Sequence, residues 1–231
     1  MVFTVKLCFL MDCTASMQPW LKKAAQHMKE IITTLELQYC TAIFTVAFVG
    51  YRDYGDSEQF LIHNFDTSDR IEQFIQGIVA KGGSDDAEDV AWGLDKLRTA
   101  IDWKRPDIGI VYHIADAPAH GLDYHDDRVD DRFPNGDPDG LDPLEPLMWL
   151  SNNHINYTFV RITRQTDRMI DVFEEYYTPE RFHVIDLASR GPNGLHDTIV
   201  ENLSSTITQH ISSRGREEDS CSPTHISCYD R

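Results

Sequence analysis

Strand-like and helix-like stretches alternate along the chain. The strand-like stretches are short apolar runs rich in β-branched and aromatic residues, and they cover Val2–Met11, Thr41–Val49, Ile108–Ala115, Ile155–Ile162 and Phe182–Asp186. Between them, apolar residues recur every three or four positions, as they do on the buried face of a helix. Strands separated by single helices need crossover connections, which makes their sheet mostly parallel. The pattern therefore predicts a doubly wound, Rossmann-like α/β fold with helices on both faces of the sheet, and one short, more polar edge strand at Gln59–His63.

The alternation also predicts the extent of the domain. It continues to about residue 211, so residues 1–211 are expected to form one domain. From Ser212 the periodicity is lost, and residues 212–231 are expected to form a flexible tail. Cys221, His225 and Cys228 in this tail lack an obvious fourth ligand and the spacing of a zinc finger, which favours a flexible segment over a metal site.

The charge of the chain narrows the choice of partner. Its 231 residues include 38 acids and 21 basic residues, for a net charge of −17. Such a chain repels phosphate backbones and anionic lipid, so nucleic acid and membranes are poor candidates, whereas divalent cations and basic proteins are good ones. No apolar stretch approaches the roughly 20 residues of a membrane-spanning helix. The five cysteines are scattered and odd in number, which indicates reduced thiols and a cytoplasmic location.

Acidic residues gather where the predicted strands end. Asp12, Asp53 and Asp116 each follow a predicted strand, and further acids lie in the segments 82–89 and 123–142. The carboxyl ends of parallel strands meet at one edge of the sheet, which is where open α/β sheets bind their ligands. The carboxylates are therefore predicted to converge on one rim, where a bound cation would offset their mutual repulsion.

The pattern Asp12-x-Thr14-x-Ser16 follows the first predicted strand. Alternate residues of a short extended segment face the same way, so one carboxylate and two hydroxyls can meet at one point. Such oxygen ligands suit Mg²⁺, Mn²⁺ or Ca²⁺ better than Zn²⁺ or copper. Asp116 and the turn Gly82–Asp85 are placed to complete the set. The competing interpretation is that Ser16 only caps the following helix.

These residues resemble the von Willebrand factor A domain and its metal-ion-dependent adhesion site. The first motif of that family, Asp-x-Ser/Thr-x-Ser, is matched by Asp12, Thr14 and Ser16, and its later Asp by Asp116. The resemblance implies a Rossmann-like von Willebrand A fold and a metal-dependent site for protein binding. The segments AFVGYRDYGD, GGSDDAEDV and DAPAHG are most similar to the von Willebrand A domains that accompany alpha-kinases.

The chain departs from the family at the second motif. Where most members have a Thr after a Gly-Gly turn, this chain has Ser84 followed by Asp85. We expect Asp85 to be the direct ligand, with Ser84 as the alternative. With Asp12, Asp85 and Asp116 around a 2+ ion the site would carry a formal charge of about −1. A carboxylate from a partner would be repelled, so the partner is not expected to bind through an acidic residue.

Several neighbouring residues have less specialised interpretations. Arg52 and Asp53 are expected to form a structural ion pair, with Asp53 behind the metal ligands rather than among them. His113, inside an apolar strand, is expected to be a hydrogen-bonded core residue. His120 and His125 are expected to face solvent or to support the metal ligands indirectly.

The function predicted from the sequence is that of a non-catalytic, metal-dependent protein-interaction module. A Mg²⁺-dependent phosphatase of the haloacid-dehalogenase kind is the enzymatic alternative, because such enzymes place a nucleophilic Asp after the first strand. The motif of those enzymes resembles Asp-x-Asp, however, and this chain has Thr14 at the position where the second Asp is required. A role as an accessory domain of an alpha-kinase system is the other alternative, implied by the resemblance.

Overall fold

The computed structural model describes residues 2–220, with side chains described as far as residue 213. Six strands form one sheet in the order β3-β2-β1-β4-β5-β6. Their bounds are β1 Phe3–Asp12, β2 Ala42–Tyr51, β3 Phe60–Asp66, β4 Ile108–Ala115, β5 Asn156–Arg161 and β6 Phe182–Asp186. All neighbouring pairs are parallel except β2 and β3. The predicted doubly wound, mostly parallel sheet with one edge strand is thus confirmed, and the edge strand β3 runs three residues past its predicted end at His63.

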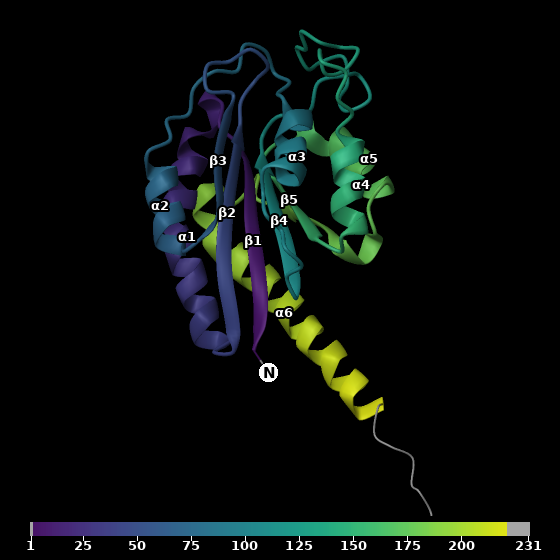
Figure 1. The fold of residues 1–231 in the computed structure, drawn as a ribbon. Helices are drawn as coiled ribbons and strands as arrows, with labels where there is room; N and C mark the ends of the chain where they lie inside the picture. The colour runs from purple at the N-terminus through teal and green to yellow at the C-terminus, as the bar shows by residue number, and fades with distance from the viewer. Residues whose placement is uncertain (1, 221–231) are drawn as a thin grey trace, which may run out of the picture.

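Helices cover both faces of this sheet (Figure 1). Those on one face are α1 Gln18–Gln38, α2 Ser68–Gln76 and α6 Leu195–Ser220, and those on the other are α3 Val90–Thr99, α4 Leu144–Asn152 and α5 Asp167–Glu175. Side chains alternate across β1 accordingly, because successive residues of a strand face opposite sides. Leu7 and Phe9 pack in the core with α1, while Cys8 and Leu10 pack in the core with α3. Both faces are apolar and buried, as a parallel sheet requires.

The described end of the chain is helical beyond the predicted domain boundary, and the flexible tail stays a prediction. Helix α6 continues through Ser212 to Ser220, nine residues past the predicted domain end. Cys221, His225 and Cys228 lie outside the described residues, so the interpretation of that segment stays a prediction. Within residues 2–220, no helix has both the length and the apolar character needed to cross a membrane.

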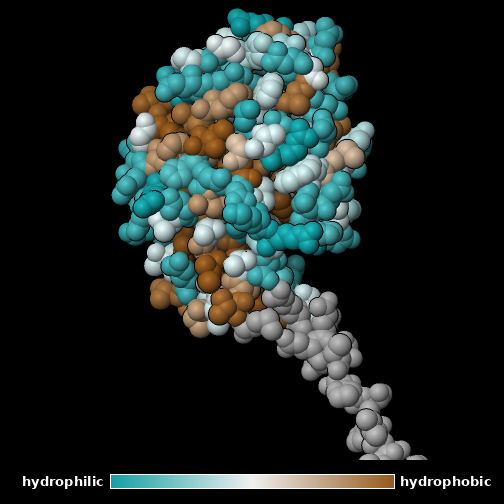
Figure 2. Space-filling model, in the orientation of Figure 1, coloured by the Kyte–Doolittle hydropathy of each residue, from teal (hydrophilic) through white to brown (hydrophobic). Residues whose placement is uncertain are grey.

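The fold brings the ends of its central strands to one rim. β1, β2 and β4 are adjacent and parallel. Their last residues, Asp12, Tyr51 and Ala115, therefore lie at the same edge of the sheet. The loops that follow β2 and β4, and the segment between α2 and α3, lie over this edge at the top of Figure 1. In Figure 2 the same end of the molecule is covered mainly by hydrophilic residues. The acidic segments predicted to converge therefore do share one rim.

Candidate metal site at the carboxyl edge of the sheet

Asp12 is a fully buried carboxylate at the end of β1. The backbone nitrogen and the hydroxyl of Thr14 both donate to Asp12 Oδ1, each at 2.7 Å. Its other oxygen, Oδ2, is buried and has no hydrogen-bond partner within the described part of the chain. Burial, followed by repulsion from Asp116, raises the pKa of Asp12 to about 8 despite the two bonds from Thr14. One oxygen of Asp12 is thus fixed, and the other is left for a ligand.

Thr14, Ser16 and Asp116 line a cavity of about 190 Å³ beside Asp12. Asp116 follows β4, and its backbone carbonyl accepts a hydrogen bond from the hydroxyl of Thr163. Like Asp12 Oδ2, Asp116 Oδ1 is buried without a partner among residues 2–213. Ser16 is exposed and lies in a short 3₁₀ turn before α1. The helix-cap interpretation of Ser16 is wrong, because the residue at the cap position of α1 is Met17 and no side-chain bond caps the helix.

Glu88 also reaches this cavity, and the sequence did not single it out. Its side chain is only 4% exposed, and its Oε2 is buried without a hydrogen-bond partner in the described structure. The backbone holds it in place, because Glu88 N donates to Pro118 O at 2.9 Å and Glu88 forms a parallel bridge with Ala119. Burial, and then the charges of Asp12 and Asp53, raise the pKa of Glu88 to about 11. A third carboxyl therefore lies beside the cavity.

Gly83 makes room for Glu88. A Cβ added at Gly83 would lie 2.7 Å from Glu88 Oε1 and 3.2 Å from Thr14 Cβ. The φ angle of Gly83 is +79°, a conformation that favours glycine. The Gly-Gly turn thus serves two purposes: it reverses the chain, and it leaves space for a carboxyl next to Thr14.

Asp85 and Ser84 are turned toward a different group of side chains. Asp85 Oδ2 accepts a hydrogen bond from Arg132 N at 2.6 Å, and Ser84 Oγ lies 3.3 Å from Asp85 Oδ1. The Ser84 hydroxyl also donates to Asp53 Oδ2 at 2.9 Å. Burial, with further contributions from Asp53, raises the pKa of Asp85. Asp85 does line the 190 Å³ cavity, but both of its oxygens have other partners.

His120 forms hydrogen bonds with two acidic side chains near this turn. Its Nδ1 donates to Asp131 Oδ1 at 2.8 Å and its Nε2 to Asp53 Oδ1 at 3.0 Å. His125 Nε2 donates to Asp131 Oδ2 at 2.9 Å. Both histidines are buried, so the expectation that they face solvent is wrong. Both histidines belong to the long loop after β4, and so does Asp131, to which both are hydrogen-bonded.

The charge on His120 follows from these partners. Burial alone would lower its pKa, but hydrogen bonds from the ring to Asp53 and Asp131 outweigh burial and raise the pKa. The same bond from His120, with that from Ser84, outweighs the effect of burial on Asp53 and lowers its pKa to about 2. The protonated imidazole therefore compensates two buried carboxylates.

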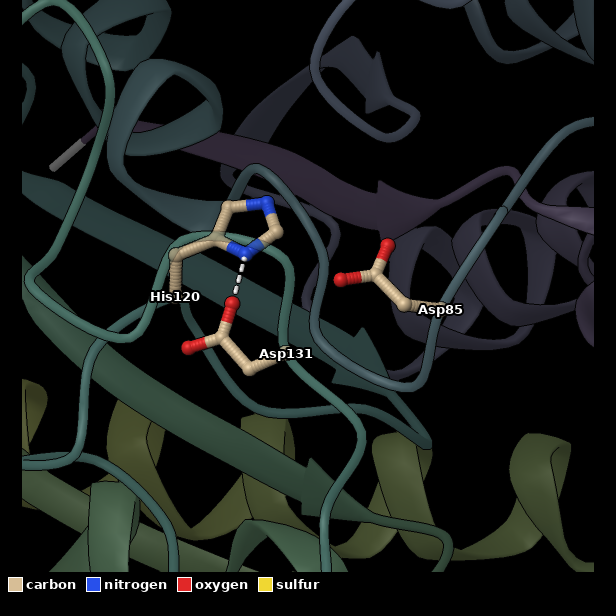
Figure 3. A group of neighbouring side chains, drawn as sticks. All are labelled: Asp85, His120 and Asp131. Carbon is tan, nitrogen blue, oxygen red and sulfur yellow. Dashed lines mark hydrogen bonds and ion pairs between the residues drawn. The ribbon is translucent and has the colours of Figure 1, made fainter.

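Asp85, His120 and Asp131 form a cluster that an ion could occupy (Figure 3). One ligand atom from each lies within 4.8 Å of the others, and the Asp85 carboxylate is turned toward the imidazole in Figure 3. Both ring nitrogens of His120 already donate to carboxylates, so an ion there would have to displace one of these bonds. Glu88 and Asp116, each with a buried oxygen that has no partner among the described residues, instead line the 190 Å³ cavity, and Asp12 is hydrogen-bonded to Thr14 in that lining.

Arg52 does not pair with Asp53 as expected. Its guanidinium is buried and donates to four backbone carbonyls of rim loops: Cys13 O at 3.3 Å, Ser57 O at 3.1 Å, Glu58 O at 2.5 Å and Val79 O at 3.0 Å. The planar fork of an arginine can serve several acceptors at once. The prediction of an Arg52–Asp53 ion pair is therefore wrong, and Arg52 instead ties together the loops that carry the candidate site.

The residues of the cavity fit a hard divalent cation. Asp12, Glu88 and Asp116 each have a buried carboxylate oxygen that accepts no hydrogen bond from the described residues. Unpaired buried polar atoms are rare and call for an explanation such as an ion. The hydroxyls of Thr14 and Ser16 add neutral oxygens, and all of these are ligands that Mg²⁺ and Ca²⁺ prefer.

Fold and site together define a class of protein, a doubly wound α/β domain with oxygen ligands at the carboxyl edge of its sheet. A family model described as the von Willebrand factor A domain matches residues 6–130. The chain therefore belongs to the von Willebrand factor A domain family, whose members typically mediate protein–protein interactions and often bind a divalent metal.

One curated relative is the alpha-protein kinase vwkA of Dictyostelium discoideum. It is 33% identical over 174 residues, which is 74% of this chain and 27% of the relative. The chain thus spans about a quarter of the length of that protein. The resemblance to von Willebrand A domains that accompany alpha-kinases is confirmed by this match.

Solved structures with the same fold are more distant in sequence. Proximal thread matrix protein 1 from the mussel byssus has a TM-score of 0.58 at 11% identity, over 87% of this chain and 45% of its own. The PilB minor pilin from Streptococcus sanguinis, as its D319A mutant, has a TM-score of 0.55 at 11% identity, over 90% of this chain and 62% of its own. At this identity the likeness concerns the fold alone.

Proposed function

We propose that this domain binds a protein partner through a divalent cation held at the carboxyl edge of its sheet. The ligands are Asp12, Thr14, Ser16 and Asp116. The second motif adds Asp85, or Ser84 as the alternative, and Asp53 lies next to these ligands without binding the ion itself. The observation that carries the proposal is the pair of buried oxygens, Asp12 Oδ2 and Asp116 Oδ1, without hydrogen-bond partners in the described chain. Mg²⁺ is the expected ion, with Mn²⁺ and Ca²⁺ as alternatives of similar ligand preference.

A binding role fits this site better than catalysis. A phosphatase of the aspartyl kind needs an acid two residues after the nucleophile, and Thr14 occupies that position, with its hydroxyl donating to Asp12. The von Willebrand factor A domains are generally non-catalytic interaction modules. Free thiols at Cys8, Cys13 and Cys40 support the expected cytoplasmic location, since cysteines stay reduced there.

The kinase relative suggests the setting in which such a module works. Because this chain matches 27% of an alpha-protein kinase, a role as an accessory domain of an alpha-kinase system is the second candidate. It differs from the first in the identity of the partner and not in the chemistry of the site.

The test is affinity purification with the full chain as bait, in Mg²⁺ and in chelator. The expected result is a set of partners that bind the parent in Mg²⁺, are released by EDTA, and are absent with the Asp12→Ala variant. Thr4→Ala, far from the rim at the start of β1, is the matched control and should retain them. A partner set that is identical in Mg²⁺ and in EDTA would refute a metal-dependent function, and recovery of an alpha-kinase would favour the second candidate.

A further inference from the structure

We propose that Glu88 is a direct ligand of the cation, and that this third carboxylate gives the loaded site a net negative charge that admits a neutral oxygen from the partner and rejects a carboxylate. The inference rests on the proposed function, because it concerns the same ion. It adds a residue that lies outside the metal-binding motifs matched in the sequence.

The position of Glu88 supports a ligand role. Its side chain lines the 190 Å³ cavity together with Thr14, Ser16 and Asp116. At 4% exposure it is nearly removed from solvent, and its Oε2 lacks any hydrogen-bond partner within residues 2–213. A residue that has an unpaired, buried carboxylate oxygen and lines a cavity together with other oxygen ligands is suited to binding a metal.

Glu88 has a hydrogen-bond partner in the neutral Thr14 side chain, but no counter-charge among the described residues explains why it is buried there. Within the part of the chain whose side chains are described, no basic side chain forms a salt bridge with Glu88. The charges that act on it are those of Asp12, Asp53 and Asp56, all of the same sign. Burying like charges together is unfavourable unless a counter-charge lies between them. His120 serves Asp53 and Asp131 in that way, whereas the group formed by Asp12, Glu88 and Asp116 has no such cation of its own.

Asp85 is less suited to the ligand role. Its Oδ2 accepts a hydrogen bond from Arg132 N, its Oδ1 is near the Ser84 hydroxyl, and its carboxylate faces His120 (Figure 3). Asp85 and Glu88 lie three residues apart on the same segment, yet the oxygen without a partner belongs to Glu88. The two residues therefore make a matched pair for mutagenesis: same charge, same loop, different orientation.

The number of carboxylate ligands around the ion determines which chemical group of a partner can complete the coordination. Asp12, Glu88 and Asp116 around a 2+ ion sum to a formal charge of −1 before any partner arrives. A carboxylate from the partner would bring the site to −2 in a buried setting, whereas a hydroxyl or carbonyl oxygen adds no charge. Replacing Glu88 by Gln brings the loaded site to zero, which is the charge at which a carboxylate becomes acceptable.

The first experiment measures Mn²⁺ affinity of the full chain by electron paramagnetic resonance. We expect Glu88→Gln to weaken Mn²⁺ binding by more than about tenfold, in line with the loss caused by changes around metal sites. Asp85→Asn, which alters the ligand that the second motif predicts, should weaken Mn²⁺ binding less than Glu88→Gln does, and Asp12→Ala should abolish binding. Unchanged affinity in Glu88→Gln, or a loss confined to Asp85→Asn, overturns the assignment of Glu88 as a ligand. Absence of Mn²⁺ binding by the parent chain would instead overturn the proposed function itself.

The second experiment uses acetate as the probe of partner chemistry. Mn²⁺ bound to the protein accelerates the nuclear relaxation of any acetate carboxylate that joins its coordination shell. We expect no acceleration with the loaded parent and a clear acceleration with loaded Glu88→Gln at equal occupancy. Equal acceleration in parent and variant would overturn the proposed selection against carboxylates. Circular dichroism of each variant establishes that it is folded before either measurement.

Discussion

Replacing Glu88 by Gln should stabilise the metal-free protein. Glu88 is buried and Gln has the same size, so the substitution leaves the packing unchanged and removes only the ionisable group. Burial and neighbouring acids raise the pKa of Glu88 from its ordinary value of 4.5 to about 11 in the folded chain. At pH 7 the carboxyl must therefore take up a proton when the chain folds. Gln resembles the protonated form and avoids that step.

The size of the effect follows from proton linkage. Each pH unit between 4.5 and 7 contributes about 1.36 kcal/mol, so folding at pH 7 costs up to about 3 kcal/mol for this carboxyl. Because the folded pKa lies above the unfolded one, the protonated group favours folding below pH 4.5, and stability is lost as the pH rises from 4.5 toward the folded pKa. For a chain of 150–250 residues, about 3 kcal/mol corresponds to roughly 6–12 °C in Tm.

The assay is urea unfolding of the parent and of Glu88→Gln in EDTA, at pH 4.5 and at pH 7. We expect the variant to be more stable by up to about 3 kcal/mol at pH 7 and nearly equal to the parent at pH 4.5. Saturating Mg²⁺ should reverse the order at pH 7, since the variant has lost a ligand. A variant that is no more stable than the parent in EDTA at pH 7 would refute the conclusion that Glu88 is desolvated among like charges.

Three further predictions concern the same rim. Mg²⁺ at about 100 times its Kd should raise the Tm of the parent by roughly 5–10 °C, from about 2.7 kcal/mol of binding free energy, and differential scanning fluorimetry should find no such shift in Asp12→Ala. His120→Gln should cost roughly 3–5 kcal/mol at pH 6, because it removes a buried cation between two carboxylates; since the pKa of His120 is raised in the folded state, this loss should shrink in urea titrations as the pH rises through that value. Gly83→Ala should weaken Mn²⁺ binding by more than about tenfold without unfolding the chain, because its Cβ would fall 2.7 Å from Glu88 Oε1, and retained affinity would show that Glu88 does not need that space.

The parts of the site that depend on regular structure are predictable from the sequence. Hydrophobic periodicity locates β1 and β4, and the rule that parallel strands end together then brings Asp12 and Asp116 to one edge. Thr14 follows from the local pattern after β1. These residues need no knowledge of distant loops, because the sheet alone brings them together.

The orientation of loop side chains is what the sequence does not supply. Asp85 and Glu88 lie in one run of acids without periodicity, so nothing local distinguishes them. A long-range contact decides between them, namely Glu88 N with Pro118 O in the loop after β4. Arg132 N in turn binds Asp85 Oδ2. The burial of His120 and the backbone bonds of Arg52 have the same origin, since both depend on loops that come from distant parts of the chain.

A bound ion changes the local charge of the rim but hardly changes the field around the molecule. One divalent cation leaves most of the net charge of −17 in place, so a partner still approaches a strongly negative surface. We therefore expect a partner with a basic surface that places a neutral oxygen on the metal, with electrostatic steering of the encounter. Raising NaCl from 50 to 500 mM at saturating Mg²⁺ should slow association by more than about tenfold, because screening acts on the long-range attraction, and should change the dissociation rate much less. Surface plasmon resonance with a partner recovered in Mg²⁺ measures both rates, and an association rate that is independent of salt would contradict a basic partner.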